Sequence, residues 1–294
     1  MSAPICDYEG SQYQHEFWGP GRAYEDAVER LALRALLPAK GNRILEIGAG
    51  YGRLADLYAG YDQIFLLDYA RTQMEQAREF LKDRPGVTYV VGDLYNLPFN
   101  DGFFDTVVTV RVLHHIASIP TAFAEVARIL TTGGAYVLEY ANKRNVKAIL
   151  RYLFRRQPSP FSREPWEFAK LNFDFHPAYM AEQLKTASFV THRQRAASFF
   201  RVGFLKRTVP TGLLAGLDGL LQAPLAGWKP APSVFLQTAV TKPALPAPAT
   251  PWWCPQCHTA IPQPGAPGGS LVCPGCGSRW RTDQGIYDFK TPLP

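Results

Sequence analysis

The sequence predicts an α/β fold in which a mostly parallel sheet carries helices on both faces, followed by a small C-terminal unit that holds most of the cysteines. Three observations predict this fold. Short, continuously apolar runs alternate with segments whose apolar residues recur at helical spacing, as in a parallel sheet buried on both faces. One apolar run leads directly into the glycine-rich turn Gly48-Ala49-Gly50-Tyr51-Gly52. Four of the five cysteines lie close together near the C-terminus.

The expected elements follow one another regularly in the first half of the chain. Apolar residues at helical spacing predict a helix over residues 24–36, which Pro38 and Gly41 end. Apolar runs predict strands over residues 43–47, 63–68, 87–91, 104–110 and 135–140. We expect the intervening helices from the glycine turn to residue 60 and over residues 72–82 and 121–130, with a turn at Gly133-Gly134. Further along, we expect a helix over residues 177–187 and strands over residues 189–200 and 233–242.

Composition shifts divide the chain into parts. Proline and alanine dominate residues 243–251, which predicts a stiff, extended linker. Two apolar and aromatic segments interrupt the regular alternation, and we expect them to roof the ligand site. The expected organisation is a large domain over residues 1–242, with an N-terminal lid (1–40) and insertions (142–177 and 202–232), then the linker (243–251) and a small domain over residues 252–294.

The charge of the chain permits an anionic partner but does not require one. The formal net charge is +6 at pH 7, and the densest basic cluster, residues 143–156, is typical of a solvated helix face rather than a nucleic-acid patch. The first residues lack the pattern of a signal peptide, and no apolar run reaches the ~18 residues of a membrane span. We therefore expect a cytoplasmic protein without a membrane span.

The glycine turn indicates a site for a small nucleotide-like cofactor. Glycines at alternate positions let the backbone turn sharply and approach a ligand closely. The turn differs from the dinucleotide fingerprint because Arg53 occupies the place of its third glycine. Asp68 ends the next strand, where a carboxylate can accept from ribose hydroxyls. The ends of parallel strands meet at one edge of a sheet, so Asp68, Asp93 and Arg111 are expected to converge with the turn.

A series of motifs in order resembles the class I S-adenosylmethionine-dependent methyltransferases. The series consists of Glu46-Ile-Gly-Ala-Gly-Tyr-Gly, Asp68, Gly92-Asp93-Leu94, and Phe104-Asp105 followed by Leu113-His114-His115-Ile116. The resemblance implies a Rossmann-like, seven-stranded sheet whose last strand, residues 233–242, is antiparallel. It also implies S-adenosylmethionine as cofactor, bound by Glu46, Gly48, Ala49, Gly50, Gly52, Asp68, Tyr69, Asp93, Leu94 and Arg111.

The resemblance also assigns parts of the cofactor to these residues. It places the glycine turn against the methionine part, Asp68 on the ribose and Tyr69 beside the adenine. Asp93 accepts from the adenine amino group, and Leu94 packs on the ring. Within the lid, Arg22 and Tyr24 match a helix of the family, and the aromatic patch Tyr13, His15, Phe17 and Trp18 is either a substrate lid or a clamp on the core.

Methyl transfer from a sulfonium needs alignment of the acceptor and at most one general base. Our candidates for this base are His114, His115 and Tyr140, although a structural role is the better interpretation of both histidines. The apolar insertions favour a small, apolar or aromatic acceptor. Two other functions stay open: an RNA or protein methyltransferase that grips its substrate with the C-terminal domain, and a non-catalytic partner subunit that binds the cofactor.

The cysteines near the C-terminus form two Cys-x-x-Cys knuckles, Cys254-Pro-Gln-Cys257 and Cys273-Pro-Gly-Cys276. Their spacing is typical of a zinc ribbon, in which four thiolates complete a structural zinc site. Iron in the same site or two disulfides are the alternatives. The neighbouring residues Trp252, Trp253, Trp280 and Arg281 either pack the ribbon on the large domain, which we favour slightly, or bind RNA or peptide.

Overall fold

The computed structural model describes residues 4–11, 20–82, 84–262 and 269–294. Its helices are η1 (Pro20–Arg22), α2 (Ala23–Leu36), η2 (Ala55–Tyr58), α3 (Arg71–Leu81), η3 (Leu113–His115), α4 (Ile119–Ile129), α5 (Val146–Leu153), α6 (Pro177–Thr186), α7 (Gly203–Thr208) and α8 (Thr211–Gln222). Its strands are β1 (Gly41–Ile47), β2 (Tyr61–Asp68), β3 (Val87–Val91), β4 (Phe104–Thr109), β5 (Leu130–Ala141), β6 (Trp166–Ala169), β7 (Asn172–Asp174), β8 (Phe189–Ala197), β9 (Ser233–Val240), β10 (Ser270–Val272), β11 (Arg279–Asp283) and β12 (Ile286–Leu293).

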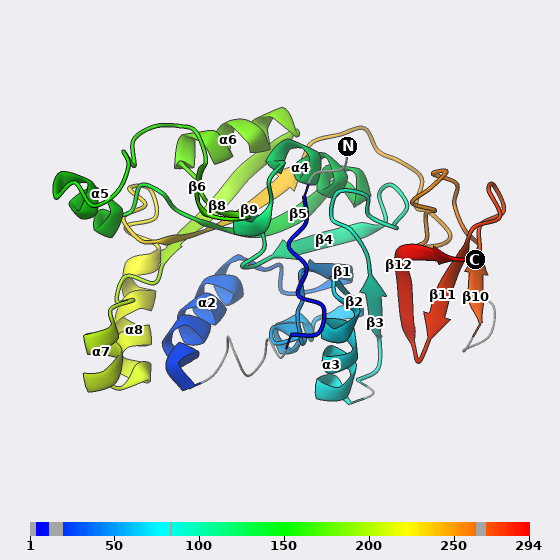
Figure 1. The fold of residues 1–294 in the computed structure, drawn as a ribbon, viewed down its shortest axis with the longest axis horizontal. Coiled ribbons are helices and arrows are strands. Elements are labelled where there is room, and N and C mark those ends of the chain that lie inside the picture. Colours follow the sequence, from blue (N-terminus) through cyan, green and yellow to red (C-terminus); the bar gives the residue numbers. More distant parts are fainter. Residues whose placement is uncertain (1–3, 12–19, 83, 263–268) are drawn as a thin grey trace.

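One twisted sheet runs through the whole molecule, with strand order β10-β11-β12-β3-β2-β1-β4-β5-β9-β8 (Figure 1). Strands β3, β2, β1, β4 and β5 are parallel neighbours, and β9 lies antiparallel between β5 and β8. These seven strands confirm the predicted α/β class, including the antiparallel direction of the last predicted strand.

Two apolar layers cover the two faces of the sheet. Successive residues of β1 alternate between them, because neighbouring side chains of a strand point to opposite faces: Ile44 joins the layer under α2 and α3, and Leu45 joins the layer under α4 and α6. In Figure 1, α2 and α3 lie below the sheet, and α4 and α6 lie above it. This arrangement leaves the carboxyl edge of the parallel strands open between the layers.

The sheet has ten strands in the described chain, not the seven that we predicted, because the cysteine-rich segment adds three. Strand β12 pairs in parallel with β3, with Tyr287 opposite Val90. The pairing satisfies backbone groups that the β3 edge would otherwise expose. Trp252, just after the linker, joins the same core as β4 and α4. The domain boundary at residues 243–251 stays a prediction.

Two local expectations were wrong. After the glycine turn the chain forms only the short 3₁₀ segment η2 instead of a helix, because Gly48, Gly50 and Gly52 all have positive φ and hold the chain in consecutive turns. The expected turn at Gly133-Gly134 lies inside β5, where the register against β4 shifts between Phe104 and Thr106. Among the described residues, no helix is long and apolar enough to cross a bilayer.

Candidate active site

A cleft opens at the carboxyl ends of β1, β2, β3 and β4, with an empty volume of about 1000 Å³ that includes solvent at its mouth. Every residue that we predicted to bind the cofactor lines it except Gly52, namely Glu46, Gly48, Ala49, Gly50, Asp68, Tyr69, Asp93, Leu94 and Arg111. Gly52 instead faces the side chains of Leu81 and Leu66, so its role is to let the turn approach α3 and β2. Their function as cofactor ligands stays a prediction.

The glycine turn is fixed against the neighbouring strands. The N–H groups of Gly48 and Ala49 both donate to the Leu67 carbonyl, at 2.7 and 3.0 Å. Gly48 has φ +69°, and a Cβ at this position would lie 2.2 Å from Cγ2 of Val112. Any larger residue would therefore both strain the backbone and displace the β4 loop.

Asp68 receives hydrogen bonds on both carboxylate oxygens. The Gly50 N–H donates to Oδ2 at 3.0 Å, and the Ala70 N–H donates to Oδ1 at 3.1 Å. Burial raises the pKa of Asp68, while these two donors oppose the shift. Each oxygen has a further lone pair, so the oriented carboxylate can also accept from hydroxyl groups of a ligand.

Asp93 stands at the opposite end of the cleft, after β3. Its Oδ1 accepts from the Tyr95 N–H at 2.8 Å, and burial raises the pKa of the carboxyl group. The hydroxyl of Tyr95 in turn accepts from the N–H groups of Ala117 and Ser118, at 3.0 and 3.2 Å. These contacts hold the loop after β3 against the loop after β4, with Leu94 in the cleft wall.

Glu46 is a buried acid at the base of the cleft. Its side chain is only 3% exposed, and within the described chain its Oε2 has no hydrogen-bond partner. Burial raises the pKa of Glu46 to about 8, although the nearby Arg53 and a hydrogen bond from Tyr58 oppose the shift. A buried acceptor without a partner is costly, which indicates that a ligand donor completes this site.

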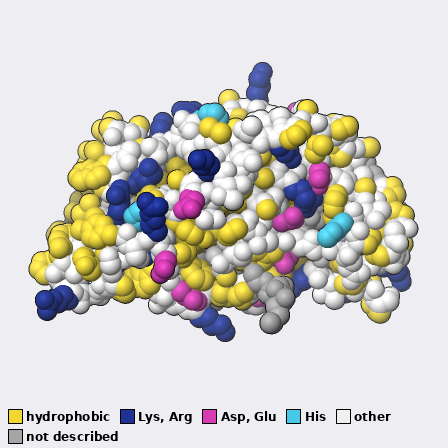
Figure 2. Space-filling model, turned by 90° about the horizontal axis from the view of Figure 1, so that it is seen from above, with side chains coloured by type: hydrophobic (Ala, Val, Ile, Leu, Met, Phe, Trp, Pro, Cys, Tyr) yellow, Lys and Arg dark blue, Asp and Glu magenta, His cyan; other side chains and the backbone are white. Residues whose placement is uncertain are grey.

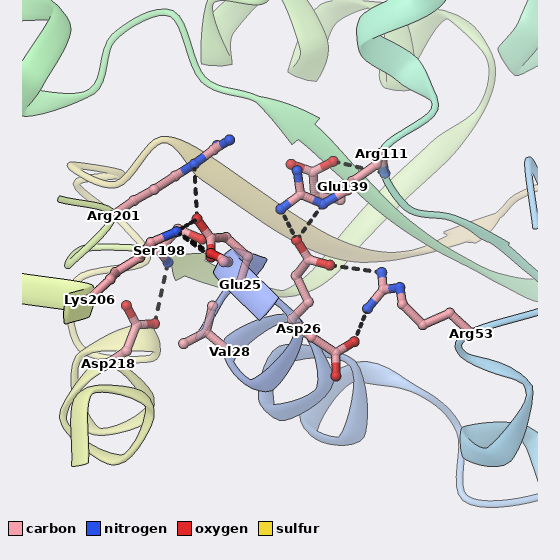
Figure 3. A network of polar contacts seen from close by, with 12 residues as sticks. Glu25, Asp26, Val28, Arg53, Arg111, Glu139, Ser198, Arg201, Lys206 and Asp218 are labelled. Carbon is pink, nitrogen blue, oxygen red and sulfur yellow. Dashed lines mark hydrogen bonds and ion pairs between the residues drawn. The ribbon is translucent and has the colours of Figure 1, made fainter. Parts of the chain in front are cut away.

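Two arginines of the cleft wall converge on one carboxylate of α2 (Figure 3). Glu29 Oε1 accepts from Arg111 Nε at 2.6 Å, and its Oε2 accepts from an Arg53 terminal nitrogen at 2.9 Å. Asp26 also binds Arg53, and Glu139 accepts from the backbone N–H of Arg111 at 3.1 Å. The network fixes both guanidinium groups beside the glycine turn.

Glu29 and Asp26 were not among the residues predicted from the sequence. A signal was present, because Glu25 and Glu29 recur at helical spacing beside the apolar stripe of residues 24–36. Glu25 and Glu29 are each only 1% exposed. Only the crossing of α2 over the sheet identifies their partners.

Of the three candidate bases, only His115 lines the cleft. Its Nδ1 lies 2.9 Å from the Leu171 carbonyl oxygen, which can only accept, so Nδ1 carries the proton. Its Nε2 therefore accepts from the Tyr8 hydroxyl, at 3.0 Å. Burial lowers the pKa of His115, which keeps the ring neutral. A neutral imidazole with an acceptor nitrogen in the cleft can take a proton.

The other two candidates lie behind the cleft wall. The His114 ring packs 3.9 Å from that of His115, and burial holds the pKa of His114 well below its usual range. Tyr140 is fully buried in the core, where burial raises its pKa. In this structure neither side chain reaches the cavity.

Residues 4–11, which we call the N-terminal strap, cross the mouth of the cleft. Ile5, Cys6 and Tyr8 line the cavity. Glu9 caps α3, because its carboxylate accepts from the N–H groups of Arg71 and Thr72, at 2.9 and 3.1 Å. The predicted aromatic patch of Tyr13, His15, Phe17 and Trp18 lies outside the described residues.

The expected roof over the site is not formed by the two insertions. No cavity-lining residue comes from residues 142–177 or 202–232 of the described chain. The first insertion does reach the edge of the site, because β7 packs beside η3 and the Leu171 carbonyl is bound to His115. The helices of the insertions, α5, α7 and α8, instead lie at one end of the molecule (Figure 1).

The four C-terminal cysteines form a compact cluster. All four Sγ atoms lie within 4.8 Å of one another, with Cys254 and Cys276 separated by 3.7 Å and Cys257 and Cys273 by 3.3 Å. The thiols are free, and these separations fit four ligands around one tetrahedral ion.

Two tryptophans pack the ribbon on the sheet. Trp252 stacks on Phe99, and Trp252 and Trp280 are each only 2% exposed.

Comparison with known proteins identifies the central part of the chain. A family model described as a methyltransferase domain matches residues 45–138. The matched region, residues 45–138, resembles a methyltransferase domain. This domain contains the glycine turn, Asp68 and Asp93, and the resemblance that we drew from these motifs is confirmed.

Two curated relatives illustrate the match. A phthiotriol/phenolphthiotriol dimycocerosates methyltransferase of Mycobacterium leprae is 35% identical over 134 residues, 42% of this chain and 46% of the relative. A malonyl-[acyl-carrier protein] O-methyltransferase of Geobacter sulfurreducens is 34% identical over 119 residues, 39% of this chain and 43% of the relative. The chain thus spans less than half the length of these curated relatives.

Solved structures show the same fold. A chain of the Haloferax volcanii complex between the Trm112 methyltransferase activator and a methyltransferase gives a TM-score of 0.55 at 18% identity, covering 82% of this chain and 100% of that chain. An S-adenosylmethionine-dependent methyltransferase of Mesorhizobium loti gives a TM-score of 0.52 at 18% identity, covering 74% of this chain and 99% of that chain. The fold therefore extends well beyond the matched domain.

Proposed function

We propose that this protein is an S-adenosylmethionine-dependent methyltransferase that acts on a small, apolar or aromatic acceptor. One observation carries the proposal: within the methyltransferase domain, the cavity brings together the glycine turn, Asp68, Asp93 and the carboxylate of Glu46, whose Oε2 makes no hydrogen bond within the described chain. The mouth of the cavity is open to solvent, so a ligand can reach these residues.

The cavity residues fit the parts of this cofactor. Asp68, oriented by two backbone N–H groups, would accept from the ribose hydroxyls, and Asp93 from the adenine amino group. Glu46 would accept from the ammonium group, because its Oε2 otherwise has no donor in the described chain. The bound cofactor supplies an activated methyl group, so the protein needs only to position the acceptor and exclude water.

His115 is our proposed general base, and the walls near it suggest the acceptor class. Its acceptor nitrogen faces Tyr8, and Ile5, Val112 and Ile116 line the same cavity. Apolar walls with one polar group suit an apolar or aromatic molecule that carries an ionisable hydroxyl. The names of two curated relatives, a phthiotriol/phenolphthiotriol dimycocerosates methyltransferase and a malonyl-[acyl-carrier protein] O-methyltransferase, support this class.

The test begins with binding. S-adenosylhomocysteine should raise the melting temperature of the purified protein, and Asp68→Ala should remove the rise. Asp62→Ala is the matched control, since Asp62 is an exposed residue of the same strand. Labelled S-adenosylmethionine with a panel of phenols, hydroxyquinones and fatty acids should then give transfer to at least one acceptor. Binding without transfer to these or to RNA and protein would favour a non-catalytic partner subunit.

We further propose that Cys254, Cys257, Cys273 and Cys276 hold a structural zinc ion, in a cytoplasm that keeps thiols reduced. Four thiolates leave no open position for chemistry, so the ion would act by stabilising the ribbon. Metal analysis should find about one zinc per chain. Cys254→Ser should lower this content, whereas Cys6→Ser should not, because Cys6 lies in the cleft. Iron, or two disulfides without metal, would contradict this assignment.

A further inference from the structure

One end of the molecule exposes large apolar side chains together with basic ones. We call it the apolar end and define it by α5, α7 and α8 with the adjoining residues Phe154 and Trp228. Its most exposed members are Phe204, Leu220, Leu153, Phe154 and Trp228, each at least 66% exposed. Isolated exposed apolar residues are ordinary, but a contiguous group of large ones indicates an interaction surface.

Helix α8 is inverted relative to an ordinary surface helix. Its polar side chains point inward: Asp218 accepts from the Tyr24 hydroxyl at 2.5 Å, and Gln222 donates to the Val28 carbonyl at 3.0 Å. Its outer face carries Leu213, Leu217 and Leu220, which are 57, 44 and 74% exposed and follow one another at i, i+4 and i+7. The inner face also buries Leu214 and Ala215, so α8 has apolar side chains on both faces and its only acid is buried. Such an outer face is suited to an apolar environment.

Helix α5 repeats the pattern and adds charge. Val146, Leu150, Leu153 and Phe154 form an exposed stripe at i, i+4, i+7 and i+8. A row of basic residues one position further on flanks the stripe, namely Lys147, Arg151 and Arg155. No salt bridge within the described chain neutralises these three charges. Long basic side chains beside an apolar stripe are typical of helices that lie in a membrane interface.

The helices that carry the two stripes, α5 and α8, lie at the same end of the protein (Figure 1). The N–H of Val146 donates to the Pro230 carbonyl at 2.9 Å, and Asn142 Nδ2 donates to the carbonyls of Lys229 and Ala231 at 2.8 and 2.9 Å. These bonds fix the start of α5 to the segment that follows α8. In Figure 2 hydrophobic side chains gather at the same end, with Lys and Arg among them.

We propose that the apolar end binds the surface of an anionic lipid bilayer. Residues 142–163 contain seven basic side chains, of which only Lys143 is buried, and no acid; the single acid of residues 199–232 is the buried Asp218. This charge matches a surface of anionic headgroups, while the leucine and phenylalanine stripes reach the acyl boundary. A second copy is the less suitable occupant, because a symmetric dimer would bring two identical basic rows together.

The proposal does not depend on methyl transfer, since no residue of the apolar end lines the cleft. Its position would nevertheless bring a membrane-dissolved acceptor near the protein. Binding to vesicles and binding of S-adenosylhomocysteine can therefore be measured separately, and either one can fail alone.

The experiment is flotation of the intact protein with phosphatidylcholine vesicles, with and without about 30% phosphatidylglycerol, at low and high salt. We expect flotation with the anionic vesicles at low salt and its weakening at high salt. Arg151→Gln with Arg155→Gln should lower the partition coefficient about fivefold for each charge removed. Leu153→Gln with Phe154→Gln, and separately Leu217→Gln with Leu220→Gln, should each lower it about tenfold or more.

Leu245→Gln and Val272→Gln are the matched controls, because both residues are about half exposed (50 and 52%) but lie outside the apolar end and do not line the cleft. The thermal shift with S-adenosylhomocysteine, unchanged in all variants, would show that each is folded. Equal flotation of control and apolar-end variants would overturn the proposal. So would an absence of flotation, or concentration-dependent dimerisation in sedimentation that the same variants abolish.

Discussion

At the scale of single residues, buried carboxylates are the main polar groups available to a ligand in the cleft. Glu46 has a raised pKa of about 8 because burial disfavours its charged form. In the free protein it therefore holds a proton through most of the neutral range. A bound ammonium group would favour the charged form, so binding should release this proton.

This linkage predicts the pH dependence of cofactor binding. Above pH 8 the carboxylate is already charged, whereas below it each bound ligand must displace a proton, so affinity should fall with falling pH. With a pKa of about 8 in the free protein, S-adenosylhomocysteine should bind about fifteenfold more tightly at pH 8 than at pH 6.5. Calorimetry in two buffers measures both the affinity and the proton release. Glu46→Gln should bind more weakly and with little pH dependence, and an unchanged slope in this variant would contradict the role of Glu46.

Glu29 is the second residue whose effect we can predict. Its carboxylate bridges Arg53 and Arg111, and removing its charge leaves two buried guanidinium groups without their common partner. We expect Glu29→Gln to lower the free energy of unfolding by about 1–3 kcal/mol and to weaken cofactor binding. Denaturant titration measures the first effect and calorimetry the second. Glu79→Gln, on the exposed face of α3, is the control that should change neither.

At the scale of elements, α2 and α8 are joined by a buried polar contact. The Tyr24 hydroxyl donates to Asp218 at 2.5 Å and accepts from the Phe200 N–H at 2.9 Å. Burial raises the pKa of Tyr24, so the phenol stays protonated and remains the donor. The contact anchors the inverted helix α8 and, through α2, the Glu29 network.

We expect Tyr24→Phe to leave the Asp218 carboxylate short of a donor and to reduce the unfolding free energy by about 1–3 kcal/mol. The carboxyl group keeps the Phe199 N–H as a donor, at 2.8 Å, which limits the loss. Tyr152→Phe is the control, because Tyr152 is 39% exposed on α5. A Tyr24→Phe protein as stable as the control would show that the contact contributes little.

At the scale of the whole molecule, the ribbon and the cleft are physically connected. Lys290 of β12 lies 3.9 Å above the ring centre of Tyr69, a residue of the cleft, and its Nζ contacts Asp7 of the N-terminal strap at 2.9 Å. Arg71 of α3 also binds Asp288 of β12 at 3.2 Å. The ribbon thus supports one wall of the cleft and the strap that crosses its mouth.

Loss of metal from the ribbon should therefore weaken cofactor binding. We expect chelation to raise the Kd for S-adenosylhomocysteine by about fivefold or more, because β12 would no longer hold Tyr69 and the strap. Lys290→Met should reproduce part of this effect without loss of metal. Lys170→Met, an exposed lysine of the β6–β7 loop, is the control. An unchanged Kd after complete chelation would show that the two sites are independent.

Local sequence signals predicted most elements of the large domain, because their apolar periodicity depends on neighbours along the chain. The strand before the glycine turn and the helix over residues 24–36 are found with small shifts at their ends, as β1 and α2. The missing helix after the turn shows the limit of this reasoning. Three glycines with positive φ gave the segment a conformation that apolar spacing does not encode.

The sequence by itself determined the fold class, the glycine turn, the acids at the strand ends and the two cysteine knuckles. Each of these features depends on residues close together in the chain or on the regular geometry of parallel strands. Only the tertiary structure decided that Glu29 binds both arginines, that His115 alone of the candidate bases reaches the cavity, that β12 completes the sheet edge, and that the insertions form the apolar end. Those contacts join segments far apart in sequence, and packing rather than local propensity selects them.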